Sequence, residues 1–200
     1  METIPSESVC YPAKLTHGHV MNLVQKGLQF IFYPSIPYEQ DLDPKSNNHY
    51  NWPIVTSYPE VISNNMDILQ ERGIRFMHPF LPYDNKKRMM QRCAEEFAPF
   101  GISESEIAEA VTAAYAEDAA FRADIRKKAD EIIAWAKETD HKCIVLAGRP
   151  YHLDPEIHHG IPELITSFGI AVLTEDSVSY RGNPVSYTHL KISAVDIFAF

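Results

Sequence analysis

Cysteine is scarce in this chain, and several familiar metal and nucleotide motifs are missing. The 200 residues include three cysteines, Cys10, Cys93 and Cys143, which are too few for a disulfide scaffold. No CxxC pair, no HExxH zinc motif and no GxxxxGK[ST] loop occurs. The sequence therefore carries no standard zinc-protease site and no P-loop ATP site.

Long apolar runs and clusters of basic residues are also missing. No apolar run approaches the roughly 20 residues that a transmembrane helix needs, and no signal peptide opens the chain. The net charge of -9 argues against a surface that binds nucleic-acid phosphates. We expect a cytoplasmic protein with thiols kept reduced, which binds neither nucleic acid nor a membrane.

The hydrophobic pattern predicts an α/β fold with parallel strands. Two short apolar runs, "LQFIFYPSI" and "IRFMHPFLP", predict buried strands on either side of the helix in "SYPEVISNNMDILQERG", which Ser57 caps, with Glu60 completing the capping box. Later, "CIVLAGRPYH", "HGIPELITSFG" and "IAVLTED" predict a strand, a helix and a parallel strand. We expect two incomplete α/β lobes, residues 1–82 and 141–184.

Residues 83–140 carry mostly helical signal and predict a connector between the lobes. Ser103 and Glu106 form a second capping box. The expected buried side of the following helix includes Ile107, Val111, Tyr115, Phe121, Ile125, Ile132 and Trp135.

The last 16 residues do not continue this pattern. One reading frame of a common transposase sequencing adapter (GTC TCT TAT ACA CAT CT) encodes "VSYTHL" at residues 185–190. We expect residues 185–200 not to be native sequence.

The stretch "ESVCYPAKLTHGHV" contains Cys10, the cysteine whose role the sequence leaves most undecided. Cys10 precedes a predicted helix N-terminus, where the helix dipole favours a negatively charged thiolate, and Lys14 adds positive charge one turn on. A buried structural cysteine, a nucleophile and a ligand for a soft metal all remain open. His17 and His19 are two residues apart, point in different directions on a helix, and are expected to line a cleft.

A second candidate site follows the strand in "AGRPYH". Ligands of open parallel sheets bind beyond the carboxyl ends of strands, so Arg149 and His152 are candidates for binding an anion. A plain strand-to-loop turn with a surface arginine explains the same residues equally well.

Three segments together resemble one family. "IPSESVCYPAKLTHGHV", "NNHYNWPIVTSYPEVISNNMD" and "IVLAGRPYHLDPEIHHGIPELITSFGIAVLTEDSV" are similar to the activase-related proteins of the 2-hydroxyacyl-CoA dehydratase system, the DUF2229 type. The resemblance covers nearly all of residues 2–183. It implies that this chain is an internal piece of a longer protein of anaerobic metabolism.

The resemblance implies a fold and a chemistry. The lobes would be two partial Rossmann-like lobes holding an iron–sulfur cluster, of the 4Fe-4S type, on cysteine thiolates. The chain would be part of a dehydratase-like electron-transfer or reductase component, partnered with an actin-like ATPase activator that carries the ATP site. The substrate would be an acyl-CoA or another small molecule, and the fragment alone would be inactive.

The resemblance also assigns ligand positions. Cys10 matches the first cluster ligand, whereas Trp52 stands where the family pattern has its second cysteine, one codon base away. Tryptophan cannot bind iron, so this departure opposes a cluster on the chain as given. A third cysteine is expected beyond the native segment, while Cys93 and Cys143 match no ligand motif and are expected to be structural.

Besides the iron–sulfur component, the sequence leaves two other functions open. One is a cluster-free α/β domain that binds an acyl-CoA or a partner protein without catalysis. The other is a cysteine hydrolase with Cys10 as nucleophile and His17 or His19 as base, which lacks an identifiable orienting carboxylate and oxyanion hole.

Overall fold

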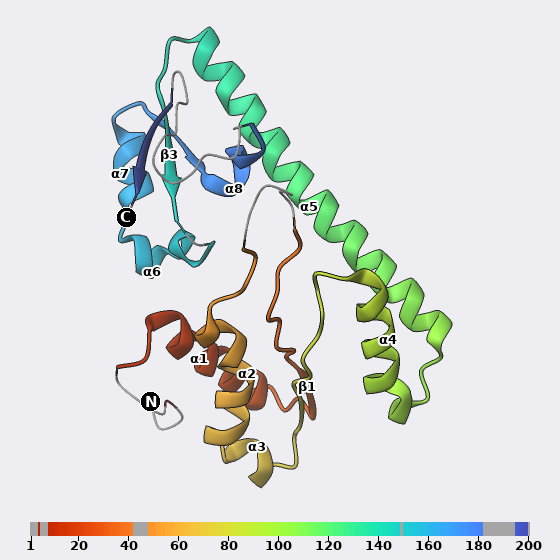
Figure 1. The fold of residues 1–200 in the computed structure, drawn as a ribbon. Coiled ribbons are helices and arrows are strands. Elements are labelled where there is room, and N and C mark those ends of the chain that lie inside the picture. The colour runs from red at the N-terminus through yellow and green to blue at the C-terminus, as the bar shows by residue number, and fades with distance from the viewer. Residues whose placement is uncertain (1–3, 5–7, 42–47, 149, 182–194, 200) are drawn as a thin grey trace. The chain divides into compact units, whose positions relative to one another are not determined.

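The computed structural model describes residues 4, 8–41, 48–148, 150–181 and 195–199, and it has a mixed α/β fold (Figure 1). The chain divides into two compact units, Met1–Thr112 and Ala113–Phe200. A long helix, α5 (Glu104–Glu138), belongs partly to each unit. Each unit contains a small parallel sheet, so the predicted α/β class with parallel strands is confirmed.

The first unit contains a strand–helix–strand arrangement. Strands β1 (Phe30–Phe32) and β2 (Arg75–Met77) run parallel, with Ile31 opposite Phe76. Helix α1 (Tyr11–Gln25) precedes β1, and helices α2 (Pro53–Asn65) and α3 (Ile68–Glu71) lie between the strands in the chain. The unit continues with α4 (Lys86–Phe97) and the 3-10 turn η1 (Ala98–Phe100).

Helix α1 begins directly after Cys10, as the sequence predicts, and ends shortly before Gly27. Pro12 stands in the first turn, where its missing N–H removes no intrahelical bond. Gly27 follows the helix with φ +77°, a left-handed conformation that glycine adopts without steric cost. The helix buries His17, Val20 and Val24 along one side.

Helix α2 begins five residues earlier than its sequence suggests, so the predicted Ser57 cap is wrong. Trp52 is the N-cap and Pro53 follows it in the first turn. The Ser57 hydroxyl donates to the carbonyl of Ile54 at 3.0 Å, inside the helix. The Glu60 carboxylate lies 3.0 Å from Nδ1 of His78 and completes no capping box. A proline at the first helical position is as good a start signal as a serine cap.

The core of the first unit joins α1, α2, α3 and β1. Its side chains are apolar and nearly inaccessible to water: Val20, Val24, Ile31, Ile62, Met66, Leu69 and Ile74. Only the central residue of β1 is buried. Phe30 and Phe32 remain about 40% exposed, contacting Phe100 and Phe97 with ring centroids 5.6 and 5.4 Å apart.

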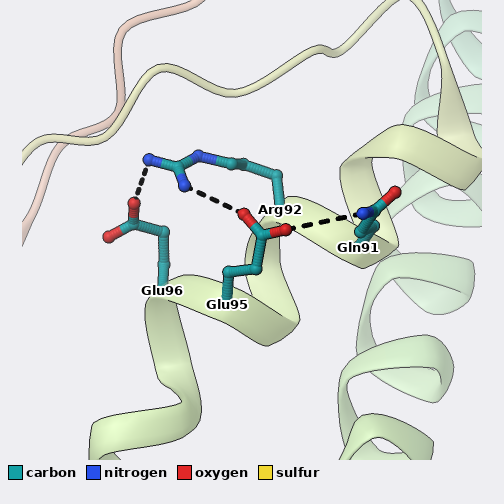
Figure 2. Close-up of polar contacts among 4 residues, drawn as sticks. All are labelled: Gln91, Arg92, Glu95 and Glu96. Atoms are coloured by element: carbon teal, nitrogen blue, oxygen red, sulfur yellow. Dashed lines mark hydrogen bonds and ion pairs between the residues drawn. The ribbon is translucent and has the colours of Figure 1, made fainter.

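Helix α4 is held by polar pairs on its own surface. Figure 2 shows Arg92 between the carboxylates of Glu95 and Glu96, with Gln91 donating to Glu95 at 3.5 Å. Pairs spaced three or four residues apart stabilise a helix by about 0.2–0.5 kcal/mol each. Asn85 caps the helix by accepting from the N–H of Arg88 at 3.0 Å. We interpret this cluster as a solvated helix face rather than a site.

Helix α5 has the predicted start but a different buried side. Glu106 accepts from the backbone N–H of Ser103 at 2.9 Å, which confirms the capping box. Ile107 and Val111 are buried as predicted. Phe121 and Trp135, expected on the buried side, are 61% and 46% exposed. The second unit instead buries Ala129, Ile133 and Ala136, because small side chains let the helix backbone approach the sheet.

The second unit is built on a parallel strand–helix–strand unit, as predicted. Strand β3 (Cys143–Ala147) pairs in parallel with β4 (Ala171–Thr174), and Val145 lies opposite Leu173. The elements between them are η2 (Pro150–Leu153), α6 (Pro155–His158) and α7 (Ile161–Ser167). Helix α8 (Glu175–Val178) and the turn η3 (Ser179–Arg181) follow β4.

A third strand, β5 (Val195–Ala199), pairs in parallel with the other edge of β3. The rest of the expected non-native tail, residues 185–194 and 200, lies outside the described residues. That the tail is foreign to the protein stays a prediction. None of the described helices is long and apolar enough to cross a lipid bilayer.

Candidate functional site

Cys10 occupies the N-cap of α1. Its backbone is extended, with φ −60° and ψ 152°, and its carbonyl accepts from the N–H groups of Ala13 and Lys14 at 3.0 and 3.3 Å. The thiol is exposed. The Cys10 side chain itself makes no capping hydrogen bond to the first turn of the helix. Cys10 therefore has the exposure that a reactive or ligating thiol needs.

Trp52 occupies the same position on α2. It is the N-cap, with φ −59° and ψ 136°, and its carbonyl accepts from the N–H of Thr56 at 3.0 Å. The indole is 47% exposed. Each of the two caps is followed by a proline in the first turn of its helix. Positions 10 and 52 are therefore local structural equivalents, and one carries a thiol whereas the other carries an indole.

Helices α1 and α2 are in contact, and they lie side by side in Figure 1. Sγ of Cys10 lies 3.4 Å from the hydroxyl of Tyr58, a buried residue in the second turn of α2. The contact therefore joins the N-cap of α1 to a position six residues along α2 from Trp52.

The other two candidates on α1 differ in burial. His17 is 3% exposed, and its Nδ1 has no hydrogen-bond partner among the residues that the structure describes. Burial lowers the pKa of His17 below its ordinary value. Lys14 is half-buried one turn from Cys10, and His19 is exposed. The two histidines thus point in different directions, as predicted, and His17 lines a cavity between α1 and α2.

The remaining cysteines are buried far along the chain. Cys93 lies on α4 and Cys143 begins β3 in the second core. Burial raises the pKa of both thiols. No set of three or more His, Cys, Asp or Glu side chains within the described ranges is arranged to hold a metal ion.

These residues by themselves do not fit an iron–sulfur cluster. Such a cluster is held by several cysteine thiolates. The α1–α2 pair presents one exposed thiol and, at the equivalent cap, an indole that cannot bind iron. A cluster at this place would need a cysteine at position 52 and at least one ligand from outside the described residues.

The second unit holds a smaller pocket where β3 and β4 end. His152 lies against Gly148, where a Cβ atom would come within 2.4 Å of its Nδ1, so a larger residue there would displace the His152 ring. The pocket has a volume of about 20 Å³, enough for roughly one water. Glu175 and Asp176 also line it, so an anion would face two carboxylates. Arg149 lies outside the described residues, and anion binding by Arg149 and His152 stays a prediction.

Tyr58 is the residue of this site that sequence reasoning missed. Its role as the contact of Cys10 depends on how α1 packs on α2, which no local pattern encodes. The wrong prediction of a helix start at Ser57 also concealed this contact, because a helix beginning there would leave Tyr58 in its first turn. Pro53 is the sequence signal that marks the true start of α2, and it thereby places Tyr58 in the second turn.

Comparison with known families gives one match. Residues 1–178 match the family described as the CoA enzyme activase uncharacterised domain, DUF2229. Neither the search of curated proteins nor the search of solved structures gave a match.

Proposed function

The chain belongs to the family of CoA enzyme activase uncharacterised domains, and we propose from this membership that it is a fragment of a dehydratase-like iron–sulfur component. The component would transfer electrons, or act as a reductase, together with an ATP-dependent activator of the 2-hydroxyacyl-CoA dehydratase type. Its two small α/β units would be incomplete Rossmann-like lobes. An acyl-CoA or another small molecule would be the substrate, and ATP would bind only to the activator.

One observation carries this proposal. The two positions that resemble cluster ligands of the family, Cys10 and residue 52, are equivalent N-caps on two helices in contact. A side chain at an N-cap lies outside the helix, and the Cys10 thiol at such a cap is exposed.

In this proposal the chain itself supplies Cys10 and the framework around it. The α1 cap exposes the thiol, Tyr58 contacts its sulfur, and an apolar core packs α1 against α2. When bound, the cluster would supply an electron carrier of low potential. The chain as given lacks the second thiol and does not hold the cluster alone.

Anaerobic reconstitution tests the proposal. The protein is the chain with Trp52→Cys, extended through the next cysteine-containing segment of its parent and treated with iron and sulfide. We expect thiolate-to-iron charge-transfer absorption that Cys10→Ala abolishes. The matched control, Cys93→Ala, removes a buried thiol with no proposed ligand role and leaves the absorption unchanged.

The same experiment distinguishes the iron–sulfur component from the alternative function, a cluster-free binding domain. A protein that stays colourless before and after Cys10→Ala, yet still binds an acyl-CoA or a partner protein, is a cluster-free binding domain. Iron retained equally in the Cys10→Ala and Cys93→Ala variants would also contradict the assignment of Cys10.

A further inference from the structure

The two halves of α1 pack differently against the rest of the first unit. In the second half, Val20 and Val24 are buried in the core together with Ile62 of α2. In the first half, Ala13 and His17 instead face a cavity of about 130 Å³ between α1 and α2. Atoms that line a void lack partners on one side and lose their dispersion attraction. The first half of α1 is therefore held to α2 less tightly than the second.

His17 is the residue of this first half whose burial depends on its protonation state. Its side chain is 3% exposed, and its Nδ1 has no hydrogen-bond partner among the described residues. A positive charge in apolar surroundings is strongly unfavourable unless it is paired. Burial accordingly lowers the pKa of His17 below its ordinary value. A histidine in water has a pKa of about 6.5, so proton uptake in mild acid favours a state in which His17 is exposed.

Helix α2 brings no negative charge to His17. Tyr58 is the other titratable side chain that lines the cavity, and a tyrosine hydroxyl is uncharged in mild acid. Among the described residues that line the cavity, none is a carboxylate. The carboxylate of Glu60 is engaged elsewhere, 3.0 Å from Nδ1 of His78.

The charged and titratable groups of the other elements around α1 are positive or uncharged. Lys14 lies one turn before His17 on α1, where a like charge is unfavourable. Arg72, which follows α3, donates to the carbonyl of Val24 at 3.4 Å. Tyr33, which follows β1, hydrogen-bonds to the side chain of Thr16. A protonated His17 would therefore meet repulsion where it needs a counter-charge.

We propose that His17 makes the contact between α1 and α2 acid-sensitive, so that uptake of a proton by its ring separates the first half of α1 from α2 while the second half stays in the core. The separation would part the Cys10 thiol from the Tyr58 hydroxyl, which lie 3.4 Å apart. Because the closed state binds the proton more weakly than the open state, the contact is intact above the ordinary pKa of histidine and weakens below it. The device needs neither iron nor a cysteine at position 52, so its test is independent of the proposed electron-transfer function.

Hydrogen exchange of the backbone amides, followed by NMR on the 200-residue chain at pH 7.5 and pH 5.5, tests the proposal. Each rate is divided into the rate of an unfolded peptide at the same pH, which gives a protection factor. We expect the protection factors of residues 14–18 to fall by about threefold to tenfold at pH 5.5. One protonation favours the open state by at most about tenfold for each pH unit below about 6.5. The protection factors of residues 20–24 should stay constant.

Two variants assign the effect to one ring. His17→Leu places an apolar side chain without a titrating group at the same position, so residues 14–18 should be equally protected at both pH values. If circular dichroism shows that this variant does not fold, His17→Gln also removes the titration. The control His19→Leu, at an exposed position on the same helix, should show the same fall as the native chain.

Three results would overturn the proposal. Protection of residues 14–18 that does not change between the two pH values would show that the contact is insensitive to acid. A fall that survives His17→Leu would assign the effect to another group. A parallel fall over the whole of α1 and α2 would show that acid unfolds the unit rather than releasing half of one helix.

Discussion

Replacing Ile62 with alanine lowers the free energy of unfolding of the first unit by about 2–5 kcal/mol. Ile62 is completely buried, at the centre of the core that joins α1 to α2. The loss combines the transfer free energy of the deleted carbons with the cavity that they leave. Since small domains are stable by only about 5–15 kcal/mol, a large fraction of the stability disappears.

The same substitution at an exposed isoleucine is the control. Ile102 is 37% exposed and lies in the same unit, so Ile102→Ala should cost well under half as much as Ile62→Ala. Denaturant titrations of both variants give the two free energies. Equal losses in the two variants would contradict the α1–α2 core.

The two tryptophans make the measurement specific to one unit. Trp52 belongs to the first unit and Trp135 to the second, and the chain has no other tryptophan. In a Trp135→Phe background, the fluorescence of Trp52 reports the unfolding of the first unit alone. Ile62→Ala should shift this transition to lower denaturant concentration.

One thiol of the native chain reacts rapidly with a thiol reagent, and two react slowly. Cys10 is exposed, whereas Cys93 and Cys143 are 6% and 7% exposed and have pKa values that burial raises. A buried thiol reacts only in the molecules whose structure has opened. If opening costs about 5 kcal/mol, labelling of the thiol is slower by roughly 10³-fold or more.

Labelling followed by mass spectrometry of peptides assigns each rate. Trp52→Cys should add a second rapid thiol, because the side chain at that cap is 47% exposed, and Cys10→Ala should remove the first. Rapid labelling of Cys93 in the folded chain would show that α4 does not bury it.

The elements that the sequence predicts well are those with local signals. The parallel unit of β3 and β4 follows from two apolar runs, a helix between them and Gly169, which has φ +74° after α7. Gly27 and the Ser103–Glu106 box mark helix ends in the same way. Each of these signals acts within a few residues, so tertiary structure has little opportunity to override it.

The buried side of α5 needed information from outside the helix. The pattern favours large residues such as Trp135, but Ala129 and Ala136 face the second core. An alanine has no strong preference for water or for the interior, so its burial depends on what packs against it. The Trp135 ring instead stacks near His141, with centroids 4.6 Å apart.

The candidate site likewise combines features with a local sequence signal and contacts between helices that have none. Cys10 and its helix start are local features, and the sequence predicts both. The contact with Tyr58 and the burial of His17 depend on how α1 packs on α2 and could not be predicted from either helix alone. Trp52 was identified by resemblance, but its equivalence to Cys10 required the structure.

The most direct test of this account is the proximity of positions 10 and 52. Nitroxide labels are attached to the two rapid thiols of the Trp52→Cys chain, and its electron paramagnetic resonance spectrum is compared with those of two singly labelled chains. The native chain labelled at Cys10 and the Trp52→Cys chain with Cys10→Ala provide those references. We predict a dipolar-broadened spectrum that sharpens when the chain is unfolded. A spectrum equal to the sum of the two references would contradict a shared site at the α1 and α2 caps.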